Sequence, residues 1–139
     1  MTPARKPLRF VLVGLANTAL DFGLLFVLRA LGLPVVPANM VSTGVALTFS
    51  FFANRSFTFR AAGSGSVTRQ GVMFVAVTLV GLWGLQPLVL LAGEALLEPA
   101  LGNPATLLIS KVLATVVSMI WNFLLYDRIV FRTRKDRND

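Results

Sequence analysis

The chain has 139 residues, of which 55% are hydrophobic and only 14% are charged, and its formal net charge is +7. A water-soluble domain carries about a quarter charged residues, so this composition indicates an environment of lipid. There is no Cys and no His, which excludes disulfides, thiol chemistry and His- or Cys-based metal sites. We expect no cofactor and no metal. The cations cluster between long apolar runs, so nucleic-acid binding is not expected.

Four apolar stretches are long enough to cross a bilayer, whose hydrocarbon core of about 30 Å needs roughly 20 helical residues. In chain order they cover residues 8–31, 35–53, 71–93 and 105–126. An LGLP segment after the first stretch and a Gly/Glu/Pro segment after the third predict turns. The polar residues 61–70 are expected to link two helix pairs. The first stretch exceeds the apolar region of a typical signal peptide, so we expect it to be retained.

Lys and Arg lie almost entirely on one predicted side of the membrane. They occupy the N-terminal segment, the region between the second and third stretches, and the C-terminal segment, and only Arg29 and Lys111 lie elsewhere. The opposite side offers Glu94 and Glu98 instead. Because cationic segments stay in the cytoplasm, both termini and the linker are predicted to be cytoplasmic. The sequence thus predicts an all-α integral membrane protein.

The two halves of the sequence align without a gap. When residues 38–60 are placed on residues 110–132, identical pairs include Thr43 with Thr115, Phe51 with Phe123, Phe59 with Phe131 and Arg60 with Arg132. Each helix pair would begin and end in the cytoplasm, so the two copies are expected to be parallel rather than inverted.

The repeat predicts a single domain over residues 1–139. Its parts are a first repeat (8–60), a cytoplasmic linker (61–70), a second repeat (71–132) and a basic tail (133–139). The repeats end in SFTFR and RIVFR, whose β-branched and aromatic residues predict short extended or interfacial segments.

These motifs resemble the GtrA-like family of small membrane proteins with four helices. The resemblance rests on RFVLVGLANTALDF (9–22), SFFANRSFTFR (50–60) and NFLLYDRIVFR (122–132). It departs at Ser50, where the family often has Asn, as the second half has at Asn122. The resemblance implies translocation of a polyprenyl-phosphate-linked monosaccharide, typically on undecaprenyl phosphate, across the bacterial inner membrane. It also implies a role in glycosylating surface polysaccharide or teichoic acid, with a separate glycosyltransferase as the source of the donor.

Polar residues within the predicted spans are candidates for a groove that binds the substrate. They are Asn17 and Asp21 in the first stretch, Gln86 in the third, and Lys111, Thr115, Ser118 and Asn122 on one face of the fourth. Gln86 precedes Pro87, which predicts a distortion of the helix there. Small and hydroxyl residues also serve as packing seams. For Asp21 and Lys111, a structural ion pair, a functional polar site and outward snorkelling of the lysine remain open.

Three arginines lie where the predicted helices enter the membrane, at the depth of a lipid phosphate: Arg9, Arg55 and Arg128. The planar guanidinium group suits phosphate, so these are candidate phosphate-binding residues. The alternative is an ordinary topology signal with attraction to anionic lipid.

Three functions fit these features. The first is a translocase. The sequence shows no Walker-type phosphate-binding loop, so ATP is not the evident energy source. The second is a non-catalytic adaptor that recruits or stabilises a glycosyltransferase. The third, a proton-coupled small drug exporter, is disfavoured by the strong charge bias, since such exporters often work as antiparallel dimers. No catalytic residue is assigned, because Asp21 is alone in the predicted spans and paired acids are absent. Four helices enclose little space, so a homodimer or larger homo-oligomer is expected.

Overall fold

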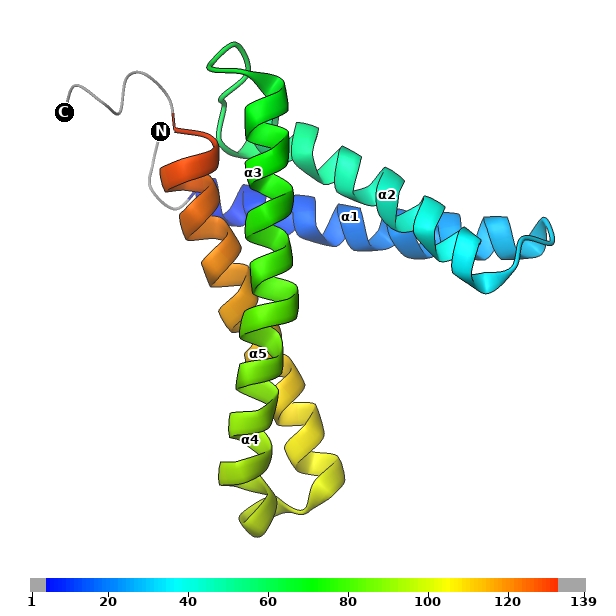
Figure 1. Ribbon diagram of the computed structural model, residues 1–139, viewed down its shortest axis with the longest axis vertical. Helices are drawn as coiled ribbons and strands as arrows, with labels where there is room; N and C mark the ends of the chain where they lie inside the picture. Colours follow the sequence, from blue (N-terminus) through cyan, green and yellow to red (C-terminus); the bar gives the residue numbers. More distant parts are fainter. Residues whose placement is uncertain (1–4, 133–139) are drawn as a thin grey trace. The chain divides into compact units, whose positions relative to one another are not determined.

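The computed structural model describes residues 5–132, with the backbone alone at residues 103 and 104, and the predicted basic tail 133–139 lies outside this range. Within the described range every regular element is helical (Figure 1). In chain order the elements are α1 (Arg5–Ala30), α2 (Val35–Ala53), η1 (Asn54–Thr58), α3 (Val67–Leu79), η2 (Val80–Leu85), α4 (Gln86–Leu101), α5 (Asn103–Leu125) and η3 (Tyr126–Val130), where η denotes a π-helical turn. The chain divides between residues 64 and 65 into two compact units.

The four predicted spans are confirmed. Four helical segments are long and apolar enough to cross a membrane: Arg5–Ala30, Val35–Thr58, Val67–Leu101 and Ala105–Val130. Their side chains explain why. Large apolar residues along the segments remain exposed in the single chain, so the spans present to their surroundings the kind of surface that hydrocarbon solvates.

In the first unit, α1 and α2 form an antiparallel hairpin joined by a tight turn, as the LGLP segment predicts (Figure 1). Gly32 adopts φ 92° there, a conformation that costs little without a Cβ. Arg29 closes the turn by donating from Nη1 to the carbonyl of Leu33 at 2.7 Å. The buried face of α2 carries a small residue at every fourth position: Ala38, Ser42, Ala46 and Ser50. Such spacing lets two helix backbones approach closely.

In the second unit, α3, η2 and α4 form one continuous helical segment that packs against α5. Buried small residues again recur at every fourth position of α5: Ser110, Ala114 and Ser118. The opposite helix presents glycine at two of the contacts. A Cβ at Gly93 would overlap Ser110 Oγ and lie 2.6 Å from Ser110 Cβ, and a Cβ at Gly81 would lie 3.1 Å from Ser118 Oγ.

The third span is longer than the sequence predicts. The Gly/Glu/Pro segment was expected to turn, but Glu94 and Glu98 lie within α4 and are exposed, and the turn follows at Gly102 with φ 75°. The prediction of a turn at this segment is wrong: α4 continues through Pro99, whose missing N–H removes one backbone hydrogen bond, and ends two residues later. The linker is also shorter than predicted, since α3 begins at Val67 behind its N-cap Ser66, whose Oγ accepts from the Arg69 N–H.

The ends of the two aligned segments are π-helical. η1 and η3 lie 72 positions apart in the sequence. Each is closed by a bond across five residues, from the Phe59 N–H to the Asn54 carbonyl at 2.9 Å and from the Phe131 N–H to the Tyr126 carbonyl at 2.8 Å. The extended form expected for SFTFR and RIVFR is therefore corrected to a widened helical turn, which satisfies backbone groups locally where no strand partner is provided. The parallel arrangement of the repeats in a membrane stays a prediction.

The contact between Gly93 and Ser110 should make Gly93→Ala destabilising. Overpacking of a tight seam costs about 1–3 kcal/mol, so we expect a lower midpoint of thermal unfolding in detergent. Gly44→Ala is the control, because a Cβ at Gly44 meets nothing within 4 Å. The double variant Gly93→Ala/Ser110→Gly should recover much of the lost stability. Equal midpoints for Gly93→Ala and Gly44→Ala would contradict this account of the seam.

Candidate functional site

The first unit places its polar residues at the seam between α1 and α2. Asp21 is half-buried, and its Oδ1 accepts a hydrogen bond from Thr43 Oγ1 on α2 at 3.3 Å. Asn17 lies one helical turn before Asp21, and its Oδ1 is buried without a hydrogen-bond partner among the described residues. A charge in a span costs about 2.5–3.5 kcal/mol even on lenient insertion scales. The Thr43 hydroxyl offsets part of that cost for Asp21.

The four polar residues of α5 do not share one environment. Lys111 and Thr115 are exposed in the single chain, and the Thr115 hydroxyl donates to the Lys111 carbonyl at 2.8 Å. Ser118 is buried and Asn122 half-buried, next to Gly81 of η2.

The reason is geometric. The buried line steps by four residues, and each step turns about 40° around a helix of 3.6 residues per turn. The predicted polar face runs straight along α5, whereas the buried residues Ser110, Ala114 and Ser118 wind slowly around it. The two sets therefore meet only near the end of the helix that holds Ser118 and Asn122.

The predicted distortion near Pro87 is confirmed as the π-helical turn η2 (Val80–Leu85) directly before it. Gln86 is the first residue of α4; its N–H bonds the Gly81 carbonyl across five residues, and its side chain is half-buried. Sequence analysis missed the residue that supports this turn from the other helix. Trp121 Nε1 donates to the carbonyl of Val77 at 3.2 Å, so an indole supplements the backbone hydrogen bonding where α3 gives way to η2.

An aromatic cluster fixes η3 against α3. Tyr126 stacks on Phe74 with ring centroids 4.6 Å apart and meets the edge of Phe131 at 6.0 Å. The Tyr126 hydroxyl and Thr78 Oγ1 are hydrogen-bonded at 2.5 Å. The sequence offered the matched phenylalanines Phe59 and Phe131 as a signal, but nothing in it paired Tyr126 with Thr78.

The candidate phosphate-binding arginines lie at helix ends. In the first unit, Arg9 donates from Nη1 to the Phe57 carbonyl at 3.1 Å, and its guanidinium carbon lies 4.8 Å from the centre of the Phe57 ring. This contact joins the start of α1 to η1, the turn that also carries Arg55.

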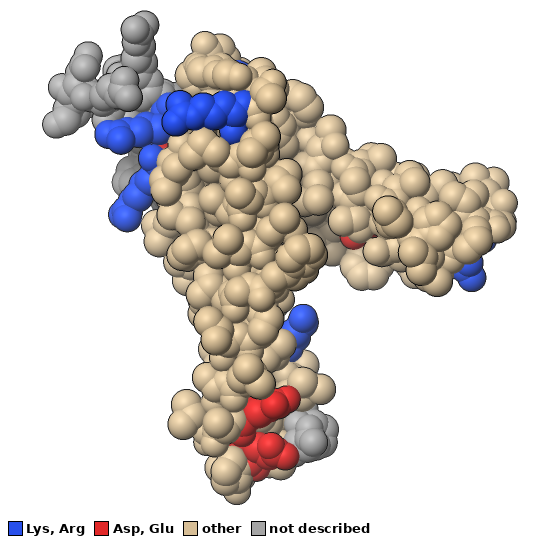
Figure 2. Space-filling model, viewed as in Figure 1, with Lys and Arg blue, Asp and Glu red and all other residues tan. Residues whose placement is uncertain are grey.

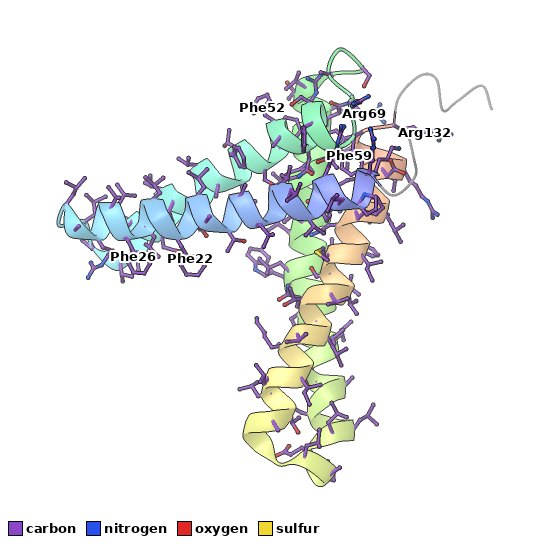
Figure 3. The ribbon with its side chains drawn as sticks, turned by 180° about the vertical axis from the view of Figure 1, so that it is seen from behind. Phe22, Phe26, Phe52, Phe59, Arg69 and Arg132 are labelled. Atoms are coloured by element: carbon purple, nitrogen blue, oxygen red, sulfur yellow. The ribbon has the colours of Figure 1, made fainter. Side chains whose placement is uncertain are left out.

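In the second unit, Arg128 is exposed in η3. Arg69 and Arg132 lie at the same end of this unit (Figure 3). The acidic side chains of α4 lie at its opposite end, next to the turn into α5 (Figure 2). Arginines therefore gather at one end of the unit and glutamates at the other, but Asp127 lies beside Arg128 in η3 and Lys111 lies within α5.

No metal site is formed in the part of the chain that the structure describes, where no three Asp or Glu side chains come together. Each unit is described by itself, so the ion pair considered between Asp21 and Lys111 stays a prediction.

Large apolar and aromatic side chains cover the exposed surfaces of the spans. Phe22 and Phe26 project outward from α1 with 56% and 69% of their surface exposed (Figure 3), and Trp83 in η2 is 72% exposed. Four apolar spans with such surfaces, and with cations at the helix ends, define a helical multi-pass membrane protein.

Comparison with known proteins identifies its family. The chain belongs to the GtrA/DPMS transmembrane-domain family, whose model matches residues 9–131. It is also 30% identical over 119 residues to the uncharacterized membrane protein YngA of Bacillus subtilis (strain 168), a match that covers 84% of this chain and 72% of that protein.

The hydrogen bond between Thr43 and Asp21 can be tested by Thr43→Val, which keeps the shape and removes the hydroxyl. We expect a loss of about 1–3 kcal/mol, because the carboxylate is left with fewer donors. Thr48→Val is the matched control: its hydroxyl donates only to the Gly44 carbonyl on the same helix, and its removal should change stability little. Thermal unfolding in detergent measures both. Equal small effects would show that the bond contributes nothing.

Proposed function

We propose that this protein moves a polyprenyl-phosphate-linked monosaccharide, such as an undecaprenyl-phosphate sugar, across the bacterial inner membrane. The sugar would then serve glycosylation of surface polysaccharide or teichoic acid. The observation that carries the proposal is membership of the GtrA/DPMS family over residues 9–131, a family associated with the translocation of lipid-linked sugars. The prenyl chain stays in lipid throughout, so the free-energy barrier to translocation comes from moving the sugar-phosphate headgroup through the hydrocarbon.

The polar groups within the spans support this assignment. A sugar phosphate that enters hydrocarbon loses its hydrogen bonds to water, at a cost of several kcal/mol for each unsatisfied group. Asn17, Asp21 and Thr43 on the first hairpin, and Lys111 on α5, are groups that replace those bonds. Retaining charges at such positions is costly, and binding a polar headgroup gives a reason to retain them.

The arginines at the helix ends support capture of the phosphate on the cytoplasmic side. Arg9, Arg55 and Arg128 provide planar donors that match phosphate oxygens. The movement needs no covalent chemistry by the protein, and we propose that it runs downhill, drawn by consumption of the sugar on the far side. A homodimer would complete a path that four helices of one chain are too few to enclose.

A second candidate function is a non-catalytic adaptor that recruits or stabilises a polyprenyl-phosphate glycosyltransferase. The specific observation that favours it is the set of cations and aromatic rings at the ends of the helices, including the contact of Arg9 with Phe57. Arg and aromatic residues are enriched at protein interfaces. An adaptor has no activity without its partner, whereas a translocase acts in liposomes alone.

The translocase can be tested with purified protein in liposomes, by following the movement of a short-chain prenyl-phosphate sugar. We expect Lys111→Ala and Asp21→Asn each to slow the movement about tenfold or more, since a hydrogen bond to a charged group contributes about 1.5–3 kcal/mol. Lys111→Arg, which keeps the charge, should retain more activity than Lys111→Ala.

Full activity of both charge-removing variants would refute the proposed polar path. No movement by well-folded wild type, with movement restored by adding the glycosyltransferase, would favour the adaptor.

The cytoplasmic location of both termini can be tested separately, because the chain contains no cysteine. Single cysteines are introduced at Ser64, in the linker, and at Ala100, near the α4–α5 turn. In intact cells a membrane-impermeant thiol reagent should label Ala100→Cys and spare Ser64→Cys, which becomes reactive when the inner membrane is broken. The reverse pattern would overturn the orientation inferred from the cations.

A further inference from the structure

Two polar side chains in η1 are buried without the hydrogen bonds they require. Asn54 and Thr58 are 2% and 0% exposed. Asn54 Oδ1 and Thr58 Oγ1 have no hydrogen-bond partner among the described residues. Native proteins leave few buried polar groups in this condition, since each costs about the free energy of a lost hydrogen bond. The two residues are four positions apart in one widened turn, so a single bound group near that turn could reach both.

The orientation of the Asn54 amide is set by its neighbours. Asn54 Nδ2 donates to the Ser50 carbonyl at 2.9 Å and to Ser50 Oγ at 3.2 Å. Turning the amide over would place its oxygen against the carbonyl oxygen of Ser50, an unfavourable contact, and leave only the Ser50 hydroxyl as a donor to it. The atom left without a partner is therefore an acceptor, and it needs a donor from outside the described chain.

The aligned turn of the second unit shows that a π-helical turn does not require such residues. The positions that correspond to Asn54 and Thr58 are Tyr126 and Val130, both buried. Tyr126 has its hydroxyl paired with Thr78 and its ring stacked on Phe74, and Val130 has no polar atom in its side chain. At these two positions the first unit thus carries unsatisfied polar groups and the second carries none; Asn122 Oδ1, one turn earlier in the second unit, is also without a partner among the described residues.

The backbone after η1 is also strained. Arg60 has φ 52°, a left-handed conformation that is uncommon for a residue with a Cβ. It is held there by the bond from the Ala61 N–H to the Arg55 carbonyl at 2.7 Å. That bond closes a C-terminal helix cap, where a left-handed residue is common and is most often glycine. π-helical turns are frequent at functional sites.

We propose that Asn54 and Thr58 form a subsite for a sugar hydroxyl of the headgroup, an inference that rests on the proposed function. Asn54 Oδ1 only accepts, and the Thr58 hydroxyl both donates and accepts. A sugar hydroxyl meets both demands, whereas an ionised phosphate has no proton for Asn54 Oδ1. The proposed subsite therefore recognises the sugar and not the phosphate. Because it lies in the last turn of the span, where local opening costs least, it is placed to be the first polar contact of the sugar.

The test compares Thr58→Val with wild type, using Ser56→Ala as the matched control. Ser56 is in the same turn, but it is exposed and its hydroxyl donates to the Phe52 carbonyl at 2.6 Å. The probes are short-chain prenyl phosphates that carry glucose, galactose, mannose or N-acetylglucosamine, and the same prenyl phosphate without a sugar. Their dissociation constants are measured in detergent, together with the midpoint of thermal unfolding without ligand.

Wild type should bind at least one sugar-bearing probe more tightly than the bare prenyl phosphate. Thr58→Val should reduce that preference about tenfold, leave binding of the bare phosphate unchanged, and raise the unfolding midpoint, because an unsatisfied hydroxyl has been removed. Asn54→Leu should also reduce the preference. Ser56→Ala should keep it.

A preference that survives Thr58→Val and Asn54→Leu would overturn the subsite, and a lower unfolding midpoint for Thr58→Val would assign the hydroxyl to structure instead. Both results leave the proposed function intact if wild type still moves a prenyl-phosphate sugar in liposomes. If wild type neither binds nor moves any of these probes, the proposed function fails, and the subsite fails with it.

Discussion

The close approach of helix backbones within each hairpin is the constraint on which the rest of the structure depends. Helices in hydrocarbon gain no hydrophobic driving force from association, so they rely on dispersion contacts and hydrogen bonds at short range. Small residues at every fourth position of α2 and α5 allow the backbones of the paired helices to come close enough for these contacts. The glycines of the facing helix complete the contact, since Ser110 occupies the space that a Cβ of Gly93 would need. This packing places Asp21, Thr43 and Ser118 at a seam, whereas Lys111 and Thr115 remain exposed.

The seams also explain which polar side chains are satisfied. A seam made of small residues leaves no room for water, so a polar atom inside it must find a partner in the chain or remain unsatisfied. Asp21 has Thr43, and Tyr126 has Thr78. Asn17 and Thr58 each keep an oxygen without a partner among the described residues. Such atoms lower the stability of the isolated chain.

Much of the fold was predictable from the sequence, because the length and apolarity of a span are local properties. The four spans and the turn at Gly32 followed from them, and Pro87 indicated the distortion that became η2. The predicted turn at Glu94 and Glu98 was wrong. Acidic residues next to a proline suggested a loop, but Glu favours helix, and Pro99 lies near the end of α4.

The candidate site was less predictable, because it depends on how two helices meet. Helical periodicity places Lys111 and Ser118 on one face of α5. In the structure the contact with the facing helix winds around α5, so Ser118 is buried and Lys111 is exposed. The partners Thr43 for Asp21 and Trp121 for the Val77 carbonyl depend on the register between helices, which a single sequence does not specify.

The length of the third span has a consequence for how the second hairpin fits in a bilayer. Val67–Leu101 contains 35 residues, or about 52 Å of helix at 1.5 Å per residue, against a hydrocarbon core of about 30 Å. Even at a tilt of about 40°, the upper limit usually seen, roughly 40 Å would stand along the membrane normal. At least one end of this segment therefore extends past the acyl chains into the headgroup layer. Because the segment carries Arg69 near its start and Glu94 and Glu98 near its end, either end meets the headgroup layer with charged side chains.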